Sequence, residues 1–400
     1  MAKYPTVLIH GFFGFGEDDL VGAIVPYWGF RPDCKLPKVL RAAGYEIYAP
    51  NVGPFNSAWD RACIIYAYLM GGTVDFGKVH AEKYGHPRYG RTYPGVLKDW
   101  GEPGAHEKIN IVGHSFGGPT VLAFNELMTN GCKEEADADP DCSPLFKGGH
   151  GDLLQSVTML SGVSNGTGLA SILGDIGVHG LSTVVCALVT AIGQFDPVLK
   201  FWDFNMDMWG FNKSKFESGK GKFVNPVSKA SRARYKNFNK NYFDSIGYEM
   251  SIECCGDINA LRGDLNPNTY YFARIADRSK KKADGSYKMD KSTFFISKAA
   301  GMVTNMYKGK NFNGKTIDPK YGFELPKWGP SDGLVNVEGQ KAPFVYPSED
   351  VGYDHDFKTA IFYNLPVEFK DHMSWCGAKE DREVYCDYML NMIKSFDDLA

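Results

Sequence analysis

The sequence lacks the features that mark membrane-spanning, nucleic-acid-binding and repetitive proteins. No apolar run reaches the roughly 18 residues that a membrane-spanning helix requires. The formal charge is only -3, with Lys+Arg 44 against Asp+Glu 47, and the two signs are mixed along the chain, which argues against a polyanionic partner. Internal repeats and low-complexity tracts are also missing. We therefore expect a globular protein with no transmembrane segment and no nucleic-acid partner.

The beginning of the chain lacks a signal segment, because no charged and then apolar stretch precedes the first expected strand. The chain is thus either cytosolic or the mature form of an exported protein. Cysteines bear on this choice. Cys132 and Cys142 bracket one loop, and Cys376 and Cys386 bracket another. These spacings suit the loop-closing disulfides of an exported protein.

Short apolar runs alternate with helical stretches along most of the chain. This alternation predicts an α/β fold with a mostly parallel central sheet and helices on both faces. The expected strands are residues 6–10, 46–50, 109–112, 156–160 and 270–275. We expect a single domain over residues 1–400, with two insertions longer than a crossover needs, at about 55–95 and about 165–250. Residues 278–290 are basic and contain Asp-Gly, which is typical of a solvated turn.

The most informative motif is Gly113-His114-Ser115-Phe116-Gly117. It matches the nucleophile elbow Gly-x-Ser-x-Gly and lies between an expected buried strand and a helical stretch from Pro119 to Met128. The sharp strand-to-helix turn exposes the serine hydroxyl, and the flanking glycines allow the two elements to approach closely. The motif predicts an α/β-hydrolase fold with Ser115 as the nucleophile.

A serine hydroxyl needs a base, and the base needs an acidic partner that fixes its tautomer. In this fold the acid follows the serine in the chain and the histidine comes last. Asp332, in a Pro-Ser-Asp-Gly loop, is the best acid. Two late histidines compete for the role of base. His372 is favoured over His355, because it lies nearer the final helix and His355 lies in a polar stretch.

The negative oxygen that forms during acyl transfer needs two backbone N–H donors. One should come from Phe116, directly after the nucleophile, and one from Phe12, in the loop after the first strand. We interpret His10 as a residue that braces this loop, and His114 as a packed neighbour of the nucleophile.

Several blocks of the sequence, in order, resemble the large zinc-containing bacterial lipases of the thermoalkalophilic and staphylococcal type. They are residues 4–14, 59–63, 71–75, 88–95, 143–146 and 267–271. The resemblance implies an α/β-hydrolase fold, hydrolysis of triacylglycerols or related esters, a helical lid and secretion. It also implies a triad of Ser115, Asp332 and His372.

Metal-ligating residue types gather in the two insertions. Asp60, His80 and His86 lie in the first and Asp207 in the second, and two imidazoles with two carboxylates can form a tetrahedral zinc site. The resemblance places the zinc ligands of the family at these four positions. Asp203 is a competing carboxylate. Four protein ligands leave no open position, so we expect a structural zinc that joins the two insertions.

The same resemblance suggests calcium near the catalytic histidine, but two features argue against it. Ser374 stands where the family has an acidic residue, and no Asp-Pro follows before the end of the chain. In place of calcium, a disulfide between Cys376 and Cys386 could hold this loop.

The stretch from Leu169 to Ile192 is apolar, which suits either a buried helix or a lid over the active site. We therefore expect a secreted carboxylic ester hydrolase of the lipase type that acts on acylglycerols or other hydrophobic esters, including polyesters, at a lipid or polymer interface. An amidase or thioesterase would share the triad. A non-catalytic binding protein would be expected to have lost a member of it.

Overall fold

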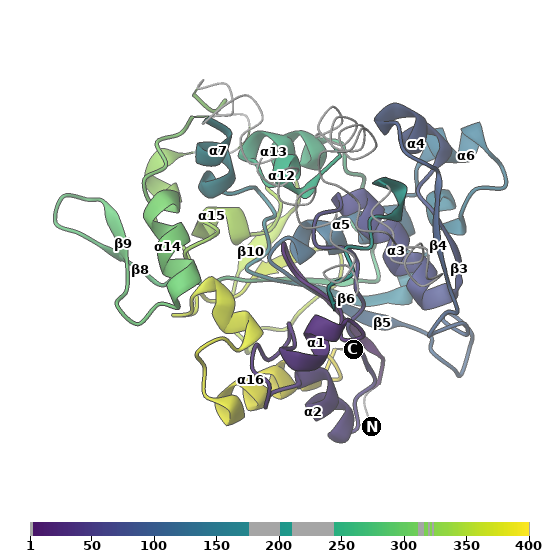
Figure 1. The fold of residues 1–400 in the computed structure, drawn as a ribbon, viewed down its shortest axis with the longest axis horizontal. Coiled ribbons are helices and arrows are strands. Elements are labelled where there is room, and N and C mark those ends of the chain that lie inside the picture. Colours follow the sequence, from purple (N-terminus) through teal and green to yellow (C-terminus); the bar gives the residue numbers. More distant parts are fainter. Residues whose placement is uncertain are drawn as a thin grey trace.

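The computed structural model describes residues 3–175, 201–209, 244–310, 316–318, 321 and 324–399. Its centre is a seven-stranded sheet in the order β10-β11-β7-β6-β5-β1-β2 (Figure 1). All neighbouring strands of this sheet run parallel. Its strands are β1 (Thr6–Ile9), β2 (Ile47–Tyr48), β5 (Ile109–His114), β6 (Leu154–Leu160), β7 (Tyr270–Arg274), β10 (Ser348–Asp350) and β11 (Phe362–Asn364).

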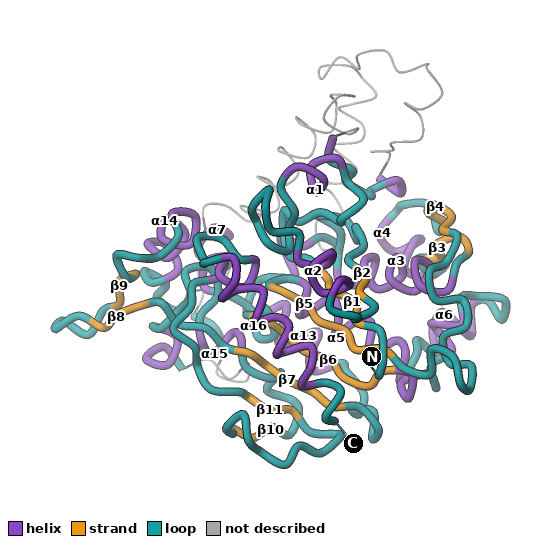
Figure 2. The backbone as a smooth tube through the Cα atoms, turned by 90° about the horizontal axis from the view of Figure 1, so that it is seen from below, coloured by secondary structure: helices purple, strands orange, loops and turns teal. Residues whose placement is uncertain are grey.

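Both faces of the sheet are covered by helices, as the pattern of the strands requires. Alternate residues of a strand point to opposite faces, and Val7 and Ile9 of β1 belong to one core cluster while Leu8 belongs to the other. Helices α3 (Ala58–Met70) and α5 (Gly117–Thr129) pack on the first face. Helices α2 (Leu36–Ala42) and α16 (Arg382–Ser395) pack on the second. Figure 2 shows α16 lying across the strands. The expected α/β architecture is confirmed.

The first insertion contains a small antiparallel hairpin. Strands β3 (Gly72–Asp75) and β4 (Tyr89–Tyr93) pair with each other, and α4 (Lys78–Tyr84) lies between them in the chain. A second hairpin, formed by β8 (Ser279–Lys281) and β9 (Tyr287–Met289), occupies the segment expected to be a solvated turn. It projects from the body of the molecule (Figure 1), and its turn at Asp284 and Gly285 is exposed.

The remaining helices surround these elements. They are α1 (Leu20–Ile24), α6 (Lys133–Ala138), α7 (Gly168–Asp175), α12 (Ile246–Glu249), α13 (Ile252–Ala260), α14 (Phe295–Thr304) and α15 (Val337–Gln340), with short 3₁₀ turns η1 (Pro144–Lys147), η2 (Gly151–Leu153), η3 (Asp207–Trp209), η5 (Leu325–Trp328) and η6 (His372–Cys376). None of the helices in the described ranges is long and apolar enough to cross a membrane.

Candidate active site and metal centre

Ser115 lies at a sharp turn between β5 and α5, where the elbow motif places it. Its φ is +59°, a left-handed backbone conformation that residues other than glycine rarely adopt. The flanking glycines permit this turn, because a Cβ on Gly113 would lie 2.2 Å from the carbonyl oxygen of Gly117. A Cβ on Gly117 would in turn lie 2.5 Å from the carbonyl oxygen of Ile9. The backbone strain is thus concentrated at Ser115 itself.

His372 and Asp332 form a buried pair. His372 Nδ1 lies 2.7 Å from Asp332 Oδ2, and the backbone N–H of His372 donates to the carbonyl oxygen of Asp332 at 3.0 Å. The other carboxylate oxygen, Oδ1, accepts from the N–H groups of Leu334 at 2.9 Å and Val335 at 2.8 Å. These bonds fix the carboxylate, which in turn fixes the imidazole with a proton on Nδ1 and leaves Nε2 to accept one.

The turn that carries His372 is held by its own cap. Asp371 accepts from the N–H of Met373 and Ser374 Oγ accepts from the N–H of Asp371, which together form a capping box at the start of η6. Asp371 also accepts from the N–H of Phe294 at 2.8 Å, which ties the turn to α14. The competing histidine, His355, lies elsewhere, with its Nε2 3.8 Å from Glu349.

His114 connects the serine turn with the histidine turn. Its Nε2 lies 3.0 Å from the carbonyl oxygen of His372, so it must be the protonated nitrogen. Its Nδ1 then accepts from the hydroxyl of Tyr27 at 2.6 Å, and that hydroxyl accepts from the N–H of Gly11 at 2.8 Å. Burial lowers the pKa of His114 well below its ordinary value, which keeps this bridge neutral. Sequence analysis missed Tyr27, because an isolated tyrosine between two loops carries no motif.

The loop after β1 lies directly against Ser115. A Cβ on Gly11 would come within 2.6 Å of the Ser115 Cβ, so only glycine fits there. The N–H groups of Phe12 and Phe116 make no hydrogen bond to other described residues. Behind the loop, the buried guanidinium of Arg61 donates to the carbonyl oxygen of His10. Arg61 was seen in the sequence only as part of a matched block.

Two carboxylates and two imidazoles meet in a buried cluster made of Asp60, His80, His86 and Asp244. Their ligand atoms all lie within 4.8 Å of one another. His80 Nε2 is 3.3 Å from Asp60 Oδ1, and His86 Nε2 is 3.4 Å from Asp244 Oδ2. Such a set of donors suits a metal ion.

The oxygen and nitrogen atoms that could coordinate a metal in this cluster make few ordinary hydrogen bonds, so a cation would fit among them. Both carboxylate oxygens of Asp60, the Nε2 atoms of His80 and His86, and Asp244 Oδ2 are buried without a hydrogen-bond partner in the described part of the chain. Burial raises the pKa of Asp60, and Asp244 raises it further. A divalent cation would satisfy all these atoms at once and relieve the repulsion between the carboxylates.

Groups around the cluster orient its imidazoles. His86 Nδ1 lies 2.9 Å from the carbonyl oxygen of Pro87, which directs the lone pair of Nε2 toward the cluster. The ring of His80 stacks on Trp59, with centroids 5.1 Å apart. Glu135 accepts from the N–H groups of Val79 and His80 at the start of α4.

The structure does not bring Asp207 into this cluster, and that prediction is corrected. Asp207 Oδ2 accepts from Arg91 Nε at 2.6 Å, and the competing carboxylate, Asp203, binds the same guanidinium at 2.7 Å. Arg91 binds one oxygen or more of each of these carboxylates and holds them away from the cluster, where Asp244 is the fourth member instead. Asp244 lies within the second insertion, but no spacing to another ligand marked it in the sequence.

The expected disulfides are not formed. Cysteines 34, 63, 132, 142, 254, 255, 376 and 386 are free thiols, and Cys186 lies outside the described residues. Cys376 Sγ faces His114 at 3.3 Å, whereas Cys386 Sγ lies 3.5 Å from Cys34 Sγ. Short separation in the sequence was misleading, because Cys376 lies in η6 and Cys386 in α16 and their side chains face different partners.

Most of the predicted lid, Leu169 to Ile192, lies outside the described residues. Only its beginning is described, as α7. The lid therefore stays a prediction.

The parallel sheet and the elbow after β5 define an α/β-hydrolase. A family model described as Lipase-like, C-terminal domain matches residues 2–381, and the chain belongs to this family. It is 32% identical over 344 residues to a lipase of Staphylococcus epidermidis, which covers 85% of this chain and 45% of that protein. It is 33% identical over 347 residues to Lipase 1 of Staphylococcus aureus, covering 85% and 46%. The chain thus spans less than half the length of these curated relatives.

Solved structures are similar over nearly the whole chain. The lipase of Staphylococcus hyicus matches with a TM-score of 0.81 and 29% identity, covering 99% of this chain and 96% of that one. EstA from Clostridium botulinum matches with a TM-score of 0.78 and 31% identity, covering 100% and 88%. The resemblance seen in the sequence is therefore confirmed at the level of the family and the fold.

Proposed function

We propose that this protein hydrolyses carboxylic esters by way of a covalent acyl-enzyme. The observation that carries the proposal is the buried His372–Asp332 pair beside the strained turn of Ser115. His372 Nε2 would take the proton of the Ser115 hydroxyl while the oxygen attacks the ester carbonyl. The same proton then passes to the departing alcohol. In the second half of the reaction, His372 would take a proton from water while the water oxygen attacks the acyl-enzyme. Return of that proton to Ser115 Oγ would release the acid and restore the serine.

Two further parts of the site have roles in this proposal. Asp332 would stabilise the imidazolium that forms on His372, while remaining ionised itself. The N–H groups of Phe12 and Phe116, which bind no other described group, would stabilise the negative oxygen of the tetrahedral intermediate. Arg61 and Tyr27 hold the loop that positions the first of these donors.

The proposed substrates are hydrophobic esters, with acylglycerols first and polyesters as a variant. The family and the lipases among its relatives support this choice. So does the aromatic cluster beside the elbow, where Phe13 is 39% exposed and its ring lies near Phe12, Phe55 and Trp202. Such a surface favours acyl chains over charged groups. Export from the cell belongs to the same proposal and rests on the resemblance to the lipases alone.

We also propose that the cluster of Asp60, His80, His86 and Asp244 binds zinc. Two imidazoles and two carboxylates match the ligands of tetrahedral zinc better than those of calcium or magnesium, which prefer oxygen donors. With four protein ligands, the zinc would stabilise the insertion and offer no open position to substrate or water.

The triad is tested by paired substitutions. Ser115→Ala and His372→Ala should each lower the hydrolysis of p-nitrophenyl esters by at least about three orders of magnitude, because the members act as a unit. Neither change should unfold the protein. His355→Ala is the matched control and should retain activity. Loss of activity in His355→Ala with retention in His372→Ala would contradict the assignment of the base. A panel of graded p-nitrophenyl esters, triolein emulsion and a polyester film would define the substrate class.

A further inference from the structure

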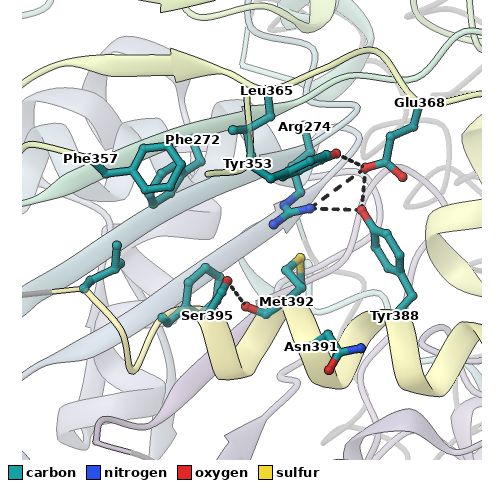
Figure 3. A pocket seen from close by; sticks show the side chains of 12 residues that line it. Phe272, Arg274, Tyr353, Phe357, Leu365, Glu368, Tyr388, Asn391, Met392 and Ser395 are labelled. Atoms are coloured by element: carbon teal, nitrogen blue, oxygen red, sulfur yellow. Dashed lines mark hydrogen bonds and ion pairs between the residues drawn. The ribbon is translucent and has the colours of Figure 1, made fainter. Parts of the chain in front are cut away.

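A pocket of about 410 Å³ lies between α16 and the ends of β7 and β11 (Figure 3), on the sheet face opposite to α3 and α5. This volume falls in the ~300–1,000 Å³ range of small-molecule sites. Most of the wall is apolar, formed by Phe272, Phe357, Leu365, Met392, Phe396 and Leu399. The pocket is separate from the elbow and from the metal cluster, and no step of the proposed reaction uses it.

Arg274 is the cationic group of this pocket. It comes from the end of β7, two residues after Phe272, so both side chains point to the same face of the sheet. The residue is only 8% exposed. Its Nη1 donates to the hydroxyl oxygen of Tyr388 at 3.0 Å, while its Nε has no hydrogen-bond partner in the described part of the chain. Figure 3 shows the guanidinium lying in the pocket between Tyr353 and Met392.

The charge of Arg274 is only partly neutralised. Glu368 is the one acidic residue among the described residues that line the pocket, and its carboxylate lies 3.9 Å from Arg274 Nη1. The same carboxylate pairs more closely with Lys370, at 2.7 Å, and accepts from the hydroxyls of Tyr353 and Tyr388. One carboxylate therefore serves two cations, which leaves positive charge in a largely apolar cavity.

We propose that this pocket binds a monocarboxylate with a hydrocarbon chain. The carboxylate would lie on the free edge of Arg274, in a charge-assisted hydrogen bond that the largely apolar walls would strengthen. The chain would lie against Phe272, Met392 and Phe396. A dianionic phosphate fits less well, since a single guanidinium faces the cavity and Glu368 would repel the second charge.

The proposal does not depend on hydrolysis by Ser115. Carboxylates with hydrocarbon chains are the acid products of the proposed reaction, but binding in this pocket follows from its own charge and walls. The experiment is therefore done in the Ser115→Ala protein, so that a failure of binding and a failure of the triad are separate results.

Octanoate, and octanol as its uncharged counterpart, are titrated into this protein and followed by calorimetry. We expect a saturable octanoate site that octanol does not fill with equal affinity. Adding Arg274→Gln should weaken this site by at least about tenfold, the equivalent of roughly 1.4 kcal/mol. Arg382→Gln removes the same charge from the exposed beginning of α16 and should leave binding unchanged.

A second variant keeps the test valid if Arg274→Gln destabilises the protein. Ser395 lines the pocket from an exposed position on α16, so Ser395→Trp should block the pocket without disturbing the core or Arg274. This substitution should abolish the octanoate site. Octanoate binding that survives both Arg274→Gln and Ser395→Trp, octanol binding of equal strength, or no saturable site in the parent would each overturn the proposal.

Discussion

At the scale of single residues, His10 shows how burial fixes a protonation state. Its Nδ1 lies 2.9 Å from the carbonyl oxygen of Gly11, and its Nε2 accepts from the N–H of Val52 at 3.2 Å. One ring nitrogen donates and the other accepts, so the neutral form satisfies the site. Burial and the neighbouring Arg61 lower the pKa of His10 to about 3 from its ordinary 6.5.

This lowered pKa predicts a loss of stability in acid. The unfolded chain binds a proton at this histidine below about pH 6.5, whereas the folded protein does so only near pH 3. The free energy of unfolding should therefore be highest above pH 6.5 and fall as the pH decreases toward 3. His10→Gln keeps one donor and one acceptor at this position. Between pH 7 and pH 4.5 its free energy of unfolding should decrease less than that of the parent, and the difference should be up to roughly 1.4 kcal/mol for each pH unit.

Urea unfolding at the two pH values measures this effect. His355→Gln, which removes a histidine from a partly exposed position, is the control and should lose stability as the parent does. An equal acid loss in His10→Gln and in the parent would show that other groups govern the acid range.

The sequence predicts local geometry best for residues that belong to a motif or to an ordered set. Ser115 was found through its glycines, and the pairing of His372 with Asp332 agrees with the chain order of the fold. Their catalytic roles stay predictions. Asp244 was missed and Asp207 was misplaced, because the choice among the acidic residues of one insertion depends on which of them Arg91 binds. That contact joins segments distant in the chain.

At the scale of elements, the longer buried strands were predicted well, and the edge strand β2 lies within the expected range 46–50, but β10 and β11 were not predicted. β1, β5, β6 and β7 are apolar and lie in the middle of the sheet, so composition marks them. β10 consists of Ser348, Glu349 and Asp350, all exposed, and its place in the sheet follows only from pairing with β11. No property of its own residues could predict it.

The metal cluster joins α3, α4 and the residues just before α12, which yields a test at this scale. Protein purified without added metal should contain about one zinc ion per chain. Asp244→Ala should lower the zinc content to near zero and reduce the melting temperature, because buried imidazoles and a carboxylate lose their common partner. Asp207→Ala removes an equal charge from the Arg91 pair and should retain the metal.

Elemental analysis decides between the two aspartates. Zinc retained in Asp244→Ala and lost in Asp207→Ala would restore the assignment made from the sequence.

At the scale of the whole molecule, packing and not covalent cross-links holds the described structure together. Eight of the nine cysteines are free thiols, and Cys186 lies outside the described residues. Burial also raises the pKa of the Cys63, Cys254 and Cys255 thiols. These thiols therefore form little thiolate at neutral pH and react slowly while the protein is folded.

A reductant should consequently leave the melting temperature unchanged. A thiol reagent at neutral pH should modify all 9 cysteines only after denaturation, without prior reduction. Fewer than nine reactive thiols in the denatured protein, together with a lower melting temperature in reductant, would show that a disulfide forms after all.

The first turn of α3 carries two adjacent residues with different attachments. Asp60 belongs to the metal cluster, and Arg61 binds the carbonyl oxygen of His10 in the loop that presents Phe12. A displacement of this turn would therefore move Asp60 in the metal cluster and Arg61 beside the loop after β1 at the same time. A metal ion that never approaches the substrate would in this way set the position of an oxyanion donor. Removal of the ion should slow turnover even while Ser115, His372 and Asp332 keep their own contacts.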